Sequence, residues 1–152
     1  MELKLRVARF DAGWGCNPRM ENSLVLVVED EPLILLDLET GLEEAGFRVV
    51  AVPNAEAAIE AFEENPGSFS SLLTDIRLGS GKSGWELARH VRNTNPTIPV
   101  VYISAHGAPQ WGAEGVPESI MITKPFAPPQ IITALSTLLN QQHPTPPADG
   151  QD

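Results

Sequence analysis

Five short apolar runs alternate with helix-length segments along the middle of the chain, and this alternation constrains the fold more than any other feature. The runs lie at residues 24–28, 47–52, 71–74, 99–103 and 119–123. Runs that are apolar throughout, rather than at every second position, are typical of parallel strands that are covered on both faces. The pattern therefore predicts an α/β fold in which helices pack on both sides of a parallel sheet.

Helix signals fill the segments between the runs. Helices are predicted from Pro32 to near Gly46 and at residues 55–64, 85–92, 108–116 and 128–141. Pro32 suits a first helical turn, and the AEAAIEAFEE segment is rich in strong helix formers. The helix at 108–116 is expected to be weak, because Pro109, Gly112 and Gly115 disfavour helical backbone.

The two ends of the chain lack this pattern. With 152 residues and 42% hydrophobic content, the chain is long enough for one domain with a full core. We predict a domain over residues 23–140, a disordered leader over 1–22 and a disordered, proline-rich tail over 141–152. Because the pattern begins just after Met20, that residue is a candidate for the true start of the protein.

Charge and composition narrow the possible partners. The net charge of -10 and the pI near 4.6 disfavour binding to nucleic acid or to an anionic membrane, and favour a cationic partner or a divalent metal. No apolar stretch is long enough to span a bilayer, and no secretory signal is visible. The single cysteine, Cys16, excludes an internal disulfide. We therefore expect a cytoplasmic protein with neither a nucleic-acid nor a membrane partner.

Polar residues follow four of the five apolar runs. They are Glu29, Asp30 and Glu31 after the first run, Asp75 after the third, Ser104 after the fourth and Lys124 after the fifth. The carboxyl ends of parallel strands meet at one edge of a sheet, so these side chains should lie close together. Carboxylates at short range repel one another, which makes a bound cation the natural resolution, and hard oxygen ligands suit Mg²⁺. Taken singly, each residue also fits an ordinary role at a helix start, in a turn or on the surface.

Four motifs carry a resemblance to a known family. The segments LVLVVEDEP, SLLTDIRLG, PVVYISAHG and IMITKPF, in this order and spacing, strongly resemble the receiver domain of two-component response regulators, of the single-domain, chemotaxis type. The resemblance covers residues 23–140. It implies a flavodoxin-like, three-layer (βα)5 sandwich with a central five-stranded parallel sheet in the order 2-1-3-4-5. It also implies transfer of a phosphoryl group from a kinase phosphohistidine to an aspartate.

The resemblance assigns a role to each strand-end residue. Asp75 matches the phosphoacceptor and a metal ligand, and Glu29 and Asp30 match the acidic pair that holds Mg²⁺. The backbone carbonyl of Arg77 matches a further metal ligand. The two remaining positions are Ser104, whose hydroxyl matches the one that bonds a phosphoryl oxygen, and Lys124, which matches the lysine that pairs with the phosphoryl group and precedes an often cis proline.

Three features depart from the family pattern. Glu29 stands where aspartate is the commoner residue, so contact with the metal through water is one option. Met121 stands where the family usually has Tyr or Phe, which puts a switch based on ring movement in doubt. Arg77 and His106 occupy positions that tune the phosphoryl lifetime in the family.

The leading hypothesis is a stand-alone response regulator, not an enzyme, that is phosphorylated on Asp75 with Mg²⁺. Its expected partners are a sensor histidine kinase or a histidine phosphotransfer protein, and a target that binds the face of the fourth helix, fifth strand and fifth helix. Dimerisation stays open. One alternative is a receiver-like interaction module that takes no phosphate. Another is a nucleotide-binding enzyme built on GSGKSG, but that motif needs a glycine at position 76, which is Ile76.

Overall fold

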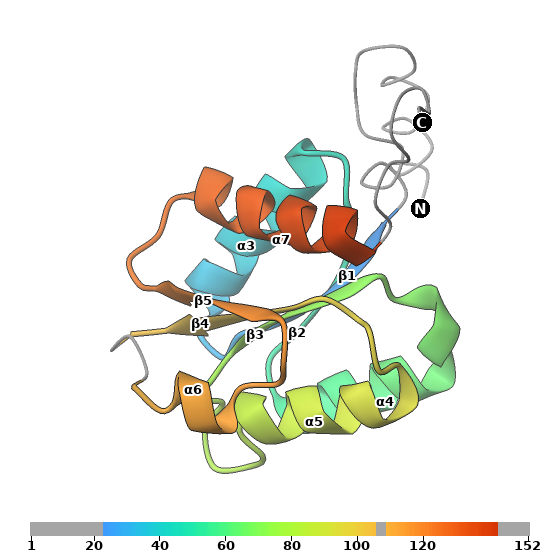
Figure 1. Cartoon of the computed structure of the whole chain (residues 1–152). Helices are drawn as coiled ribbons and strands as arrows, with labels where there is room; N and C mark the ends of the chain where they lie inside the picture. Colours follow the sequence, from blue (N-terminus) through green and yellow to red (C-terminus); the bar gives the residue numbers. More distant parts are fainter. Residues whose placement is uncertain (1–22, 106–108, 143–152) are drawn as a thin grey trace, which may run out of the picture.

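A five-stranded parallel sheet forms the centre of the molecule, in a computed structural model that describes residues 23–105 and 109–142 (Figure 1). The strands are β1 (Leu24–Val28), β2 (Arg48–Val52), β3 (Ser71–Asp75), β4 (Val100–Ser104) and β5 (Ser119–Thr123). Their order in the sheet is β2-β1-β3-β4-β5, and every neighbouring pair is parallel. The predicted α/β class and strand order are confirmed. The predictions about Cys16, Met20 and His106 fall outside the described residues.

Two layers of helices cover the sheet (Figure 1). The helices are α3 (Pro32–Glu44) and α7 (Pro128–Gln142) on one face, and α4 (Ala55–Glu64), α5 (Gly84–Thr94) and α6 (Trp111–Glu114) on the other, with a 3-10 turn at Pro66–Ser68. Successive strand residues point to opposite faces, so Val25 and Val27 pack in the α3/α7 core while Leu26 and Val28 pack in the α4/α5 core. Burial on both faces explains why the strands are apolar throughout.

Local sequence signals set most helix boundaries. Asn54 caps α4, because its side chain accepts the N–H of Ala57 at 2.8 Å. Ser83 and Glu86 form a reciprocal capping box at the start of α5. Gly46 follows α3 in the left-handed region, with φ 102°. Capping side chains and a glycine thus fix these three helix ends.

Two predicted boundaries are corrected. The helix predicted at 108–116 is limited to the single turn of α6, because the chain becomes extended at Gly115, with φ -72° and ψ 147°. Helix α7 continues to Gln142, so the predicted start of the tail at 141 falls inside this helix. Among the helices of the described part of the chain, none is both long and apolar enough to cross a membrane.

Candidate functional site

The carboxyl ends of four strands bring the predicted site residues together. Asp75 is the last residue of β3 and Ser104 the last residue of β4. Glu29 directly follows β1, and Lys124 directly follows β5. The parallel register pairs Val28 of β1 with Thr74 of β3, so the residues after them meet at the same edge. The sheet therefore places all of the strand-end residues where the sequence pattern predicts them.

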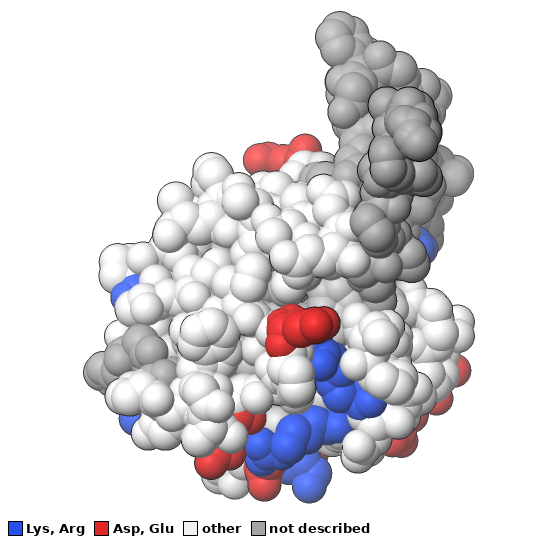
Figure 2. All heavy atoms as spheres, in the orientation of Figure 1, with Lys and Arg blue, Asp and Glu red and all other residues white. Residues whose placement is uncertain are grey.

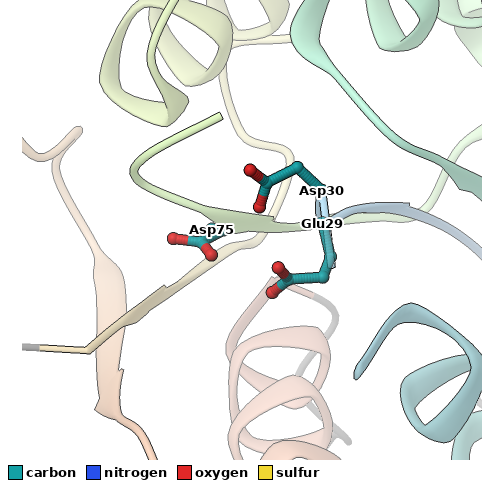
Figure 3. Close-up of side chains that lie close together, drawn as sticks. All are labelled: Glu29, Asp30 and Asp75. Atoms are coloured by element: carbon teal, nitrogen blue, oxygen red, sulfur yellow. The ribbon is translucent and has the colours of Figure 1, made fainter. Parts of the chain in front are cut away.

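Three carboxylates form an acidic cluster at this edge. One oxygen from each of Glu29, Asp30 and Asp75 lies within 4.8 Å of the others. Figure 3 shows the three carboxylate groups turned toward a common space from the ends of β1 and β3. Glu29 and Asp75 are buried and Asp30 is exposed, so a ligand could reach the cluster from the Asp30 side.

The donor chemistry of this cluster fits a hard divalent cation. Its ligand atoms are all carboxylate oxygens, which Mg²⁺ prefers. The Oε1 atom of Glu29 is buried and accepts a hydrogen bond from no described residue, although Nζ of Lys124 lies 3.2 Å away. A buried acceptor without a donor is costly unless something else satisfies it. A bound cation would satisfy it, so the described residues fit Mg²⁺.

Lys124 balances part of the negative charge. Its Nζ donates a hydrogen bond to Oδ2 of Asp75 at 2.8 Å and lies 3.8 Å from Oε1 of Glu31. Burial alone would lower the pKa of Lys124, but its hydrogen bond to Asp75 and the negative charges of Asp75 and Glu29 outweigh burial and raise that pKa. The ammonium is therefore held in its charged form. The Lys124–Pro125 peptide bond is cis, as the resemblance implies.

Glu29 is the unusual acid of the cluster. Burial, together with the charge of Asp75, raises its pKa to about 7, against the lowering effects of the Glu31 N–H and of Lys124. Near neutral pH, the metal-free site therefore holds Glu29 as a mixture of protonated and ionised forms. A cation bound to the cluster would favour the ionised form.

The glycine-rich run after Asp75 serves local geometry. The backbone N–H of Arg77 donates to Oδ1 of Asp75 at 3.1 Å, and Gly79 turns the chain with φ 82°. At Gly84, an added Cβ would overlap the carbonyl oxygen of Asp75, so only glycine lets α5 begin this close to β3. Ser83 caps α5. Lys82 donates its backbone N–H to Glu56 at 3.2 Å.

Comparison with known proteins decides the family. The model of the response regulator receiver domain matches residues 25–136. The chain belongs to the response regulator receiver domain family. Among solved structures, a response regulator receiver protein from Sinorhizobium medicae WSM419 is 42% identical, with a TM-score of 0.77 over 82% of this chain and 99% of that chain.

Curated relatives of this receiver domain are longer proteins. The phyllosphere-induced regulator PhyR of Methylorubrum extorquens is 31% identical over 118 residues, which cover 76% of this chain and 43% of PhyR. The two-component response regulator PhoP of Pseudomonas aeruginosa is 35% identical over 120 residues, which cover 77% of this chain and 52% of PhoP. The chain thus spans about half the length of the curated relatives that it matches.

Receiver domains share a general function. Receiver domains are signalling modules of two-component systems, and they interact with histidine kinases and downstream effectors. They generally bind Mg²⁺ at an acidic pocket, and this receiver domain has an acidic cluster formed by Glu29, Asp30 and Asp75.

A cavity of about 770 Å³ opens above Asp75 in the receiver domain. Its lining includes Asp75, Ser104 and Lys124, together with Trp85, Arg89 and Glu114 from helices α5 and α6. The last three residues were not predicted as site residues. Trp85 and Arg89 are four residues apart on α5 and so share a helix face, which is the only sequence signal that could have grouped them. Nothing in the sequence links either of them to Glu114.

Trp85 has a packing role at the cavity wall. Its ring centroid lies 4.7 Å from that of Tyr102, and the two rings are tilted by 58°. Tyr102 is buried and its hydroxyl accepts the backbone N–H of Val116 at 3.1 Å. The wall of the cavity is thus connected to the segment that follows α6.

Proposed function

We propose that this receiver domain acts as a stand-alone response regulator that accepts a phosphoryl group from a histidine kinase or phosphotransfer protein on Asp75. The observation that carries the proposal is the setting of the Asp75 carboxylate. It is hydrogen-bonded to Lys124 at 2.8 Å and to the Arg77 N–H at 3.1 Å, and it lies within 4.8 Å of the Glu29–Asp30 pair.

Phosphoryl transfer requires positioning and neutralisation of charge more than covalent chemistry by the protein. The Asp75 carboxylate forms the new P–O bond while the P–N bond to the donor imidazole breaks, so the products are an acyl phosphate and histidine. A carboxylate nucleophile has no proton to lose, and a general base is therefore unnecessary. The Lys124 ammonium, already beside Asp75, is placed to neutralise phosphoryl oxygens, and Ser104 lines the same cavity with its hydroxyl.

Four groups would hold the metal. They are the carboxylates of Glu29, Asp30 and Asp75 and the backbone carbonyl of Arg77. Bound Mg²⁺ supplies charge neutralisation at the transferred group. Glu29 is fully buried and its carboxylate belongs to the cluster, which supports a role for this glutamate at the position where aspartate is commoner.

The output of the proposed regulator is protein binding through the face of α6, β5 and α7. This face contains the fourth helix, fifth strand and fifth helix of the receiver fold, since α6 is the fourth αβ connection. Trp111 on α6 is 38% exposed, so the face already offers an aromatic side chain to a partner. Phosphorylation would change affinity for the target by changing this face.

Intact-mass spectrometry tests the proposal. The full chain is incubated with Mg²⁺ and a small acyl-phosphate donor, and the mass increment of one labile phosphoryl group is expected. Asp75→Asn should lose the increment, whereas Asp37→Asn, at an exposed aspartate on α3, should keep it. No increment on the unmutated chain would favour the alternative, a receiver-like interaction module that takes no phosphate.

A further inference from the structure

Helix α6 is attached through exposed side chains. Each of its four described residues, Trp111 to Glu114, is exposed, so no buried side chain fixes the helix to the sheet. Its attachment to α5 is made by Arg89, whose Nη1 donates to both the backbone carbonyl oxygen and Oε1 of Glu114, at 3.1 and 3.2 Å. Nε1 of Trp111 also donates to Oγ of Ser119 on β5 at 3.0 Å. The Arg89–Glu114 contact is therefore one of two polar contacts that attach α6 in the described part of the chain.

The Arg89–Glu114 contact lies at the rim of the Asp75 cavity. Both residues line this cavity, together with Asp75 and Lys124. The two side chains are 49% and 46% exposed, so water and other ions compete for them and the ion pair is weak. Figure 2 shows basic atoms gathered over the region of α5, with acidic atoms beside them; α5 carries Arg89 and Arg92. A new anion in the cavity would compete with Glu114 for Arg89.

A second contact, by contrast, is buried. The hydroxyl of Tyr102 accepts the N–H of Val116, just after α6, and both residues lie in the core. This bond is shielded from competing water and ions. Val116 can therefore act as a fixed point when α6 moves.

We propose that Arg89 is a phosphoryl-sensing residue that exchanges partners, from Glu114 in the unphosphorylated domain to the phosphoryl group on Asp75, and thereby releases α6. The inference rests on the proposed phosphorylation of Asp75. A phosphoryl group brings up to two negative charges and three acceptor oxygens into the cavity, and a guanidinium binds such a group better than it binds one carboxylate oxygen. Lys124 is already engaged by Asp75 and Glu29, whereas Arg89 is half-exposed at the cavity rim and bonded to Glu114, which the new charge can displace.

This exchange gives the domain a switch that requires no aromatic residue at position 121. Met121 packs against the same core as Trp85 and Tyr102, and it has no ring to move. In the proposed switch, the moving group is Arg89 and the released element is α6, which belongs to the face proposed to bind the target.

Hydrogen exchange on the full chain tests the inference. The measured quantity is the exchange rate of the α6 amides, with and without Mg²⁺ and an acyl-phosphate donor, and the phosphoryl mass increment is recorded on the same samples. These amides include those of Ala113, Glu114 and Gly115, which donate within the α6 turn. In the unmutated chain, loss of one exposed ion pair should raise their exchange about two- to fivefold on phosphorylation.

Variants distinguish a sensing role of Arg89 from a purely structural one. Arg89→Ala should show the raised exchange already without phosphate and no further rise with it. The double variant Arg89→Glu with Glu114→Arg restores an ion pair but puts the anion on α5, so phosphorylation should no longer raise exchange. Lys82→Ala, at an exposed basic residue outside the cavity lining, should respond as the unmutated chain does.

The outcomes distinguish two failures. A phosphoryl increment with unchanged α6 exchange, or a phosphate-dependent rise that persists in Arg89→Ala, would overturn the role of Arg89 alone. A chain that takes no phosphoryl group would overturn the proposed function, and the sensing role with it.

Discussion

The floor and the rim of the Asp75 cavity are built in different ways. The floor consists of Glu29, Asp75 and Lys124, which lie at strand ends and are largely buried. Nζ of Lys124 lies 3.2 Å from Oε1 of Glu29 and 2.8 Å from Oδ2 of Asp75. The rim contact, between Arg89 and Glu114, joins two helices through half-exposed side chains. Groups held by a sheet keep one geometry, whereas groups on an exposed helical turn can change partners. The difference suggests that the floor is suited to chemistry and the rim to signalling.

The largest expected effect tests how tightly the floor is packed. Gly84→Ala places a Cβ against the carbonyl oxygen of Asp75, and neither backbone segment can move away easily. We expect a loss of about 3 kcal/mol in the free energy of unfolding, measured by urea denaturation. Gly81→Ala is the matched control, because its Cβ meets only the end of the flexible Glu56 side chain and should cost much less. Equal effects of the two changes would mean that the floor is not the more rigid region.

The next effect is a pH dependence of the floor. The pKa of Glu29 is about 7 in the folded domain and near 4.5 when the chain is unfolded. Between these values the folded state binds a proton that the unfolded state has released, so stability is present at low pH and is lost as the pH rises. In the presence of a chelator, we expect the free energy of unfolding to fall by about 2 kcal/mol from pH 5 to pH 8 because of this residue.

Comparison with Glu29→Gln isolates this contribution, because the other acids titrate in both proteins. The difference in unfolding free energy between the two should change with pH as stated, and parallel pH curves would contradict the raised pKa. Mg²⁺ bound by the ionised cluster should reduce the loss above pH 7.

A smaller effect is expected where the buried core meets α6. Tyr102→Phe keeps the ring that packs on Trp85 but leaves the buried N–H of Val116 without its acceptor. We expect a loss of about 1 kcal/mol in unfolding free energy and faster exchange of the Val116 amide. This change should be independent of phosphate, because the contact lies in the core rather than in the cavity. A phosphate-dependent effect would mean that floor and rim are coupled through Tyr102.

The smallest effect on stability is expected at the rim. Glu114→Ala removes an exposed carboxylate and leaves the backbone carbonyl for Arg89, so the unfolding free energy should fall by about 0.5 kcal/mol or less. Glu63→Ala, which breaks the exposed contact with His90 at 2.8 Å, provides a control of similar size elsewhere. A loss at Glu114 as large as that of Gly84→Ala would show that α6 is a rigid part of the fold.

The floor could be predicted from the sequence because its residues are tied to strand ends. Apolar runs mark the strands, and in a parallel sheet the polar residue after each run must reach the same edge. Glu29, Asp75, Ser104 and Lys124 are accordingly found together, as expected. The GSGKSG run was more ambiguous, since the same glycines suit a phosphate loop or a close approach of two backbones. The overlap at Gly84 favours the second explanation.

The rim could not be predicted, because it depends on contacts between residues far apart in the chain. Arg89 and Glu114 are 25 residues apart, and their meeting depends on how α5 packs and where α6 ends. Low propensity at Pro109, Gly112 and Gly115 indicated only that the helix is weak. The low helix propensity did not indicate that α6 is a single exposed turn, or that Arg89 contacts it.

Sequence patterns alone were enough to predict the layered α/β architecture, the order of the elements and the set of polar groups at the carboxyl edge. These follow from local patterns: apolar runs, caps and glycine positions act over a few residues. Folding is needed to bury Glu29 fully beside Lys124, to pack Trp85 against Tyr102 and to bring α6 into contact with Arg89. The burial of a side chain, its electrostatic environment and the attachment of a helix all depend on residues that are far apart in the sequence and meet only on folding. They therefore cannot be predicted from a local stretch of sequence.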